Sequence, residues 1–138
     1  MKYLGIDYGT KRIGVAVSDD TGSLAFPLAT ISAGKGALEA VASLVKENRV
    51  EKIIIGESKN FKNESNKVQE ATEQFKKDIA EATGLGVEYE PEFFSSAQAA
   101  HQYTPDGSRK QNPNQEKLDA AAAALILQSY LDRNRKVQ

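Results

Sequence analysis

The sequence contains no cysteine and no tryptophan, and its one histidine is His101. Without cysteine the chain forms no disulfide and offers no thiolate nucleophile, and a single histidine disfavours a conventional zinc site. No apolar run approaches the roughly 20 residues of a membrane-spanning helix, so we expect no membrane partner. The N-terminus runs directly into a strand pattern without signal-peptide character, which predicts a cytoplasmic location.

The chain also lacks an excess of positive or negative charge, because its basic and acidic residues nearly balance. Eighteen Lys and Arg residues against nineteen Asp and Glu residues leave a formal net charge of −1. No global field attracts nucleic acid, so a site for a polyanion would have to be a local patch. A length of 138 residues, of which 40% are hydrophobic, fits one globular domain spanning residues 1–138.

The first third of the chain has the alternation of β-strands. Residues 3–7 and 12–18 each read as a strand, and Gly9 lies in the turn between them. A weaker third strand covers residues 23–31, where Pro27 interrupts the pattern. Three strands joined by tight turns predict an antiparallel meander.

The rest of the chain alternates helices with strands. The expected elements are a helix in residues 36–48, a buried strand around Ile53–Ile55, a helix over Glu64–Thr83 closed by Gly84, a strand in residues 86–94, a short helix in residues 95–103 and a last helix from about Gln115 to Arg133. This order predicts an α/β fold with three α/β/α layers. The mixed five-stranded sheet would combine antiparallel hairpin strands with parallel strands.

Asp7 is the first candidate functional residue, because it ends an otherwise apolar strand. Alternation puts Leu4 and Ile6 on one face of this strand and Gly5 and Asp7 on the other. The alternative is an aspartate that only helps to form the turn.

A second group of acids alternates along the strand in residues 86–94. Glu88, Glu90 and Glu92 share one face, and Pro91 favours an edge or an end of the sheet. Glu92 lies last, at the carboxyl end where α/β sheets place their sites. We interpret Glu88 as solvated, and the residue pattern leaves Glu90 and Glu92 both open.

Asp119 is the third candidate, because it precedes a run of five alanines. Small side chains thin one face of a helix, so this helix could approach the sheet closely and bring Asp119 near the first strand. The alternative is that the alanines only favour helix formation and that Asp119 stabilises the first turns through the helix dipole.

Three carboxylates on separate elements suit a hard divalent cation such as Mg²⁺ or Mn²⁺. Cations held by carboxylates activate water and stabilise a leaving oxygen, which is the chemistry of phosphodiester hydrolysis. Lys11 and Arg12, beside Asp7, would then hold phosphate, or else form a solvated hairpin tip. We interpret His101 as structural or solvent-facing.

Four stretches carry a resemblance to a known family: "LGIDYGTKRIGVAVSD", "KIIIGES", "YEPEFFSSAQA" and "LDAAAAALILQSYLD". Together they resemble the YqgF family of Holliday-junction-resolvase-like proteins, described as nucleases of pre-16S rRNA with a ribonuclease-H-like fold. The resemblance implies a metal-dependent nuclease whose catalytic metal ligands are Asp7, Glu92 and Asp119. Glu92 is chosen because the family's Asp-Glu-Arg triplet aligns with residues 91–93.

This chain departs from the family pattern in two places. Pro91 and Phe93 flank Glu92 where the family has an acid and an arginine, and "ESKNFKNESN" replaces a segment with a Leu-Pro pair and an asparagine. These changes concern how the substrate backbone is gripped.

The resemblance implies processing of the 5′ end of pre-16S rRNA by a monomer or homodimer that binds nucleic acid. Cleavage of a Holliday junction, a branched DNA, is an alternative, and so is a non-catalytic nucleic-acid-binding module. The opening stretch also resembles the first phosphate loop of sugar kinases and actin-like ATPases. Those proteins close a second lobe around ATP, and a single domain of 138 residues lacks that lobe.

Overall fold

The computed structural model describes residues 1–9, 11–58, 65–92 and 115–135. Its elements are β1 (Tyr3–Tyr8), β2 (Arg12–Ser18), β3 (Ala25–Ser32), α1 (Ala37–Glu47), β4 (Lys52–Ser58), α2 (Ser65–Thr83), β5 (Gly86–Glu92) and α4 (Gln115–Arg135). These elements confirm the predicted order, with ends shifted by one or two residues. The short helix predicted in residues 95–103 lies outside the described residues.

The five strands form one sheet in the order β3-β2-β1-β4-β5. β1, β2 and β3 are antiparallel neighbours, and β4 pairs in parallel with both β1 and β5. The predicted mixed sheet is therefore confirmed. The run Ile53–Ile55 is fully buried in β4, as expected for a strand covered on both faces.

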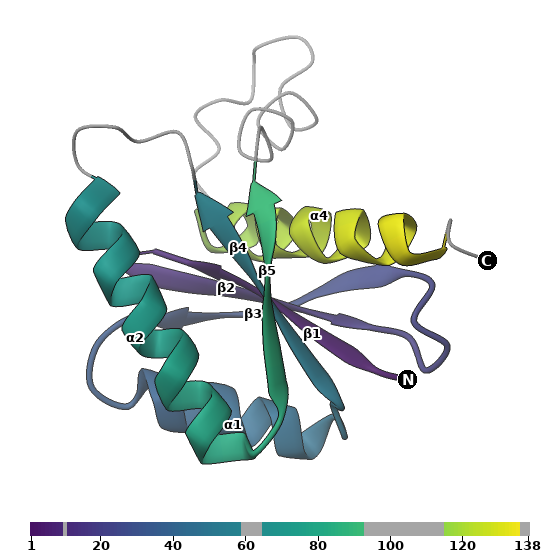
Figure 1. Cartoon of the computed structure of the whole chain (residues 1–138), viewed down its shortest axis with the longest axis horizontal. Coiled ribbons are helices and arrows are strands. Elements are labelled where there is room, and N and C mark those ends of the chain that lie inside the picture. Colours follow the sequence, from purple (N-terminus) through teal and green to yellow (C-terminus); the bar gives the residue numbers. More distant parts are fainter. Residues whose placement is uncertain (10, 59–64, 93–114, 136–138) are drawn as a thin grey trace, which may run out of the picture.

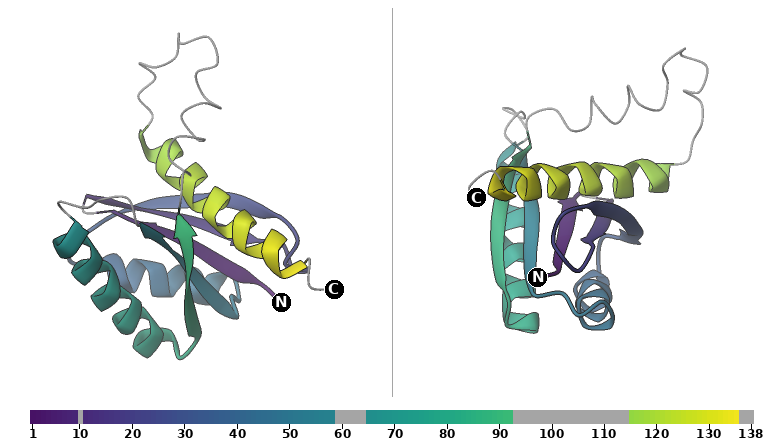
Figure 2. Two further views of the ribbon diagram at one scale, coloured as in Figure 1. Left: turned by 45° about the horizontal axis from the view of Figure 1, so that its top comes forward. Right: turned by 90° about the vertical axis from the view of Figure 1, so that its right-hand side faces the viewer.

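Helices cover both faces of this sheet (Figure 1). α1 and α2 pack on one face, where the buried aliphatic side chains of the strands are Leu4, Ile6, Ile13, Val15, Ile53 and Ile55. α4 packs on the other face, against Ala16 and Ile54. The right-hand view of Figure 2 shows the strands between α4, above, and α1, below. The structure thus has the three predicted layers.

Two strand glycines allow α4 to lie very close to the sheet. A Cβ atom added at Gly14 would be 2.0 Å from the carbonyl oxygen of Asp119, and one added at Gly5 would be 2.7 Å from Cβ of Leu127. Real Cβ contacts do not reach these distances, so both positions must lack a side chain. This is the close approach that the alanine run predicts.

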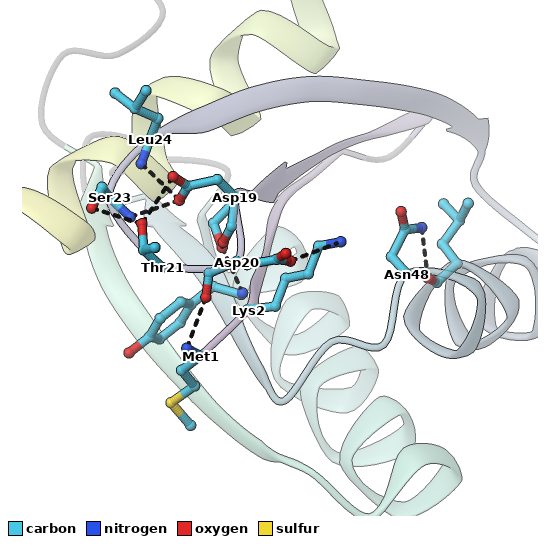
Figure 3. A network of polar contacts seen from close by, with 11 residues as sticks. Met1, Lys2, Asp19, Asp20, Thr21, Ser23, Leu24 and Asn48 are labelled. Atoms are coloured by element: carbon cyan, nitrogen blue, oxygen red, sulfur yellow. Dashed lines mark hydrogen bonds and ion pairs between the residues drawn. The ribbon is translucent and has the colours of Figure 1, made fainter.

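A turn stabilised by Asp19 joins β2 to β3 (Figure 3). Its carboxylate accepts hydrogen bonds from the backbone N–H groups of Ser23, at 2.8 Å, and Leu24, at 3.2 Å. These bonds hold the pKa of Asp19 below its ordinary value. The turn lies at the end of β2 remote from Asp7, whose register partner is Gly14.

None of the helices in the described ranges combines the length and the apolar character that crossing a bilayer requires.

Candidate active site

Asp7 lies near the end of β1, on the face of the sheet that α4 covers. Its strand neighbour on that face is Gly5, which contacts α4, whereas Leu4 and Ile6 point into the opposite core. In the antiparallel pair Asp7 stands directly opposite Gly14 of β2. The side chain is half-buried. β1 therefore holds a carboxylate beside a position that has no side chain.

Asp119 reaches the same place from the other end of the sequence. Its carbonyl group lies where a side chain of residue 14 would be, so the backbone of α4 rests directly on β2. Because Gly14 is the register partner of Asp7, this contact brings the two aspartates to adjacent positions. The sequence patterns did not single out Gly14 as the position of this contact, although a glycine inside a strand often marks a close backbone approach.

The two cations of the β1–β2 turn have different environments. Nε of Arg12 donates a hydrogen bond of 2.7 Å to Oδ2 of Asp119, with the two side chains 36% and 20% exposed. Lys11 is exposed. The turn also depends on Gly9, because a Cβ there would lie 2.7 Å from the carbonyl oxygen of Arg12. Arg12 is thus held against an acid, where the sequence predicted a phosphate contact or a solvated tip.

Glu88 on β5 is partly exposed and bonded to two neighbours. Its carboxylate accepts from Nζ of Lys52 at 2.5 Å and from the hydroxyl of Tyr130 at 3.1 Å. The bond from Lys52, helped by Tyr130, holds the pKa of Glu88 below its usual value. The expectation of a solvated Glu88 is therefore only half right, since the side chain is 47% exposed but paired.

Glu90 is buried beneath the C-terminal part of α4. Only 4% of the residue is exposed, and its carboxylate accepts a hydrogen bond from Nη2 of Arg133. Burial raises the pKa of Glu90, while the positive charge of Arg133 acts in the opposite direction. A carboxylate that is buried and already paired is a poor ligand for an external metal. This favours Glu92 over Glu90 as the third acid of a site.

Glu92 is the last residue of β5 and the register partner of Ser58 on β4. Its side chain lies outside the described part, as do His101 and Phe93. Arg12 is therefore bonded to Asp119, and the backbone of Asp119 lies against Gly14, the register partner of Asp7. Glu92 is placed only by its position along β5.

The donor chemistry of these acids fits a hard divalent cation. Asp7 and Asp119 supply carboxylate oxygens, which Mg²⁺ and Mn²⁺ prefer, and the chain has no cysteine to compete. Within the described side chains no group of three or more His, Cys, Asp and Glu residues is arranged to hold a metal. A third protein ligand would therefore come from elsewhere in the chain, and Glu92 is the candidate.

Comparison with known proteins identifies the family of this chain. A family model described as "RuvX: Holliday junction resolvase" matches residues 1–133. The chain belongs to this family. A relative from Streptococcus sanguinis (strain SK36), named "Putative pre-16S rRNA nuclease", is 38% identical over 138 residues, covering 97% of this chain and 99% of the relative. A protein of the same name from Streptococcus mutans is 37% identical and covers 96% and 99%. These matches confirm the resemblance found in the sequence.

Solved structures of resolvases share the fold. Thermus thermophilus RuvC in complex with a Holliday junction substrate superposes with a TM-score of 0.62 at 18% identity, covering 98% of this chain and 96% of that one. Fowlpox virus resolvase with its junction DNA gives a TM-score of 0.57 at 18% identity, covering 97% and 99%. At such identities the likeness concerns the fold alone, and it confirms the predicted ribonuclease-H-like architecture.

Proposed function

We propose that this member of a nuclease family hydrolyses phosphodiester bonds in structured nucleic acid, and that its substrate is the 5′ region of pre-16S rRNA in the cytoplasm. Asp7, Glu92 and Asp119 would hold Mg²⁺ or Mn²⁺. One observation supports the proposal: the backbone of Asp119, far along the chain, contacts Gly14, which is the register partner of Asp7. The names of the relatives support the choice of substrate.

The chain's own groups have distinct tasks in this proposal. Asp7 is fixed by a buried strand, and Asp119 is fixed by its backbone contact with β2. Lys11, exposed beside them, would contact the phosphate backbone of the substrate. When bound, the divalent cation supplies an activated water and stabilises the departing oxygen.

Cleavage of branched DNA is the second candidate function. It is favoured by the description of the family and by the junction complexes among proteins of the same fold. Symmetric cutting of a four-way junction requires two sites related by a twofold axis, so this function would need a homodimer. A monomer would be enough to trim a precursor RNA.

The experiment offers the purified protein three substrates, each with and without millimolar Mg²⁺ or Mn²⁺. They are a pre-16S rRNA fragment, a four-way DNA junction and plain single strands. We expect metal-dependent cleavage of the RNA precursor, lost in Asp7→Asn while RNA binding persists. Asp20→Asn makes the same chemical change on a side chain that is 91% exposed at the far turn, and it serves as the matched control.

Two outcomes would contradict the proposal. Full cleavage by Asp7→Asn, in a preparation free of contaminating nuclease, would remove the aspartate from the mechanism. Binding of all substrates without metal-dependent cleavage of any would make the protein a non-catalytic binding module.

A further inference from the structure

Arg12 contacts Asp119 through the inner nitrogen of its guanidinium group. The bond runs from Nε to Oδ2 at 2.7 Å. Of the five N–H donors of an arginine, four lie on the two terminal nitrogens beyond Nε. The side chain as a whole is 36% exposed. Within the described part of the chain, this bond through Nε engages the carboxylate with one donor of the group, and the remaining donors of Arg12 lie on its outer end.

The position of this pair distinguishes it from an ordinary surface ion pair. Exposed pairs typically contribute little to stability and have no fixed geometry. Here the backbone of Asp119 is already held against Gly14, which lies two residues after Arg12 on the same face of β2. The bond from Arg12 therefore acts on the few torsions that the Asp119 side chain still has.

We propose that Arg12 is a positioning residue for Asp119 and, through its terminal nitrogens, also the phosphate contact beside the two aspartates. One planar group would then tie the substrate backbone to a metal ligand and fix the distance between them. The inference rests on the proposed function and deepens it. Lysine has a single charged nitrogen and cannot make both contacts in fixed directions.

Arg12→Lys is the informative variant because it keeps the positive charge beside Asp119. Changes in metal affinity then report on the geometry of the carboxylate, since the electrostatic effect of losing a cation is avoided. Lys46→Gln is the matched control, because it removes an exposed cation of α1, which packs on the opposite face of the sheet.

Three readouts separate positioning from simple attraction: kcat against KM on the pre-16S rRNA fragment, the salt dependence of RNA binding, and the rise in melting temperature caused by Mg²⁺ or Mn²⁺. For Arg12→Lys we expect kcat to fall about 10- to 100-fold, with RNA affinity within about 3-fold and a smaller metal-induced rise in melting temperature. For Lys46→Gln we expect kcat, RNA affinity, salt slope and metal response close to wild type, and for Lys11→Gln we expect weaker binding and a salt slope reduced by about one.

The two proposals fail in different ways. Suppose that wild type cleaves, and that Arg12→Lys has the same kcat and the same rise in melting temperature on adding metal. Arg12 is then only a surface cation, and the inference is wrong. If wild type cleaves no substrate, the proposed function is wrong. The melting response still decides the positioning role in that case, because an equal metal response in wild type and Arg12→Lys, or none in either, contradicts it.

Discussion

The two faces of the sheet are built from the same strands but carry side chains of very different size. Towards α1 and α2 the strands present large aliphatic side chains that are fully buried, such as Ile6 and Val15. Towards α4 the alternate positions carry Gly5, Gly14 and Ala16. We call the face covered by α1 and α2 the thick face, because large side chains separate those helices from the sheet. We call the face covered by α4 the thin face, because there the helix backbone itself contacts the sheet at Gly14.

This difference explains how a small domain places its acids. Long side chains between a helix and a sheet hold the two backbones apart, and changes in the packing of those side chains can then move the helix. Where glycine faces backbone, as at Gly14 and Asp119, the contact leaves no room for adjustment. The thin face thus fixes the position of Asp119 relative to β1, and the thick face supplies the stability that holds the strands.

Among substitutions that change packing, Gly14→Ala is expected to lower cleavage the most, because it adds a side chain at the tightest contact between α4 and the sheet. The added methyl group would lie 2.0 Å from the Asp119 carbonyl oxygen, so α4 must move away from β2. We expect cleavage to fall at least about 100-fold and the free energy of unfolding to fall by about 1–3 kcal/mol, measured by single-turnover kinetics and chemical denaturation.

Gly86→Ala is the matched control for this substitution, since a Cβ at Gly86 meets no atom within 4 Å. It should leave both measurements close to wild type. Wild-type cleavage by Gly14→Ala would show that the close contact with α4 is not needed for the site.

Ile79→Ala tests the thick face. Ile79 is a fully buried residue of α2 in the larger apolar cluster. Its truncation should lower the free energy of unfolding by about 2–5 kcal/mol in urea denaturation. The turnover of the folded protein, measured well below its melting temperature, should stay within about 2-fold of wild type. A large loss of turnover in fully folded protein would mean that the two faces are not separable.

Glu90→Gln sharpens the comparison at the far end of the thin face. Burial raises the pKa of Glu90, so between the ordinary and the raised pKa the folded state binds more protons than the unfolded state. This group therefore makes stability fall as pH rises through that interval, starting from its ordinary value of 4.5. Urea denaturation from pH 4 to 7 should show a flatter profile in Glu90→Gln than in wild type.

Glu81→Gln, an exposed acid on α2, is the control for this pH profile. A wild-type profile that Glu90→Gln leaves unaltered would show that the Arg133 pair outweighs the burial of Glu90.

Asp19→Asn should have the smallest effect, because the Asp19 turn lies at the end of β2 remote from Asp7 and the bond from Gln128 of α4 goes to the carbonyl oxygen of Ser23 rather than to Asp19. The bonds from Ser23 and Leu24 lower the pKa of Asp19. Its contribution to stability is therefore complete above the ordinary value of 3.8 and is lost as pH falls through the lowered pKa. The melting temperatures of wild type and Asp19→Asn should differ slightly at pH 7 and converge in acid, below the lowered pKa of Asp19, with cleavage unchanged. A difference that persists in acid would assign the effect to lost hydrogen bonds.

The sequence predicts the fold well because local patterns determine it. Alternation identifies the strands, the buried run Ile53–Ile55 identifies the central parallel strand, and Gly84 ends α2 with a positive φ of 74°. The alanine run also correctly predicts a close approach of the last helix.

The partners of the charged groups could not be predicted in the same way. Arg12 meets Asp119, and Glu90 meets Arg133, only because α4 crosses the sheet at a particular angle and depth. That crossing depends on the packing of the whole thin face, so no spacing in the sequence encodes it. The backbone contact at Gly14 is different, because a glycine within a strand often marks a close approach of another backbone and could have indicated this contact.

The most direct test of the account is a double-mutant cycle on metal-dependent cleavage with Asp7→Asn, Asp119→Asn and the double variant. Groups that act as one unit are not additive, so each single variant should lose about 1,000-fold or more and the double variant should be no slower than the slower single one. Cleavage near the wild-type rate by either single variant, in preparations free of contaminating nuclease, would contradict a site built from Asp7 and Asp119 on the thin face.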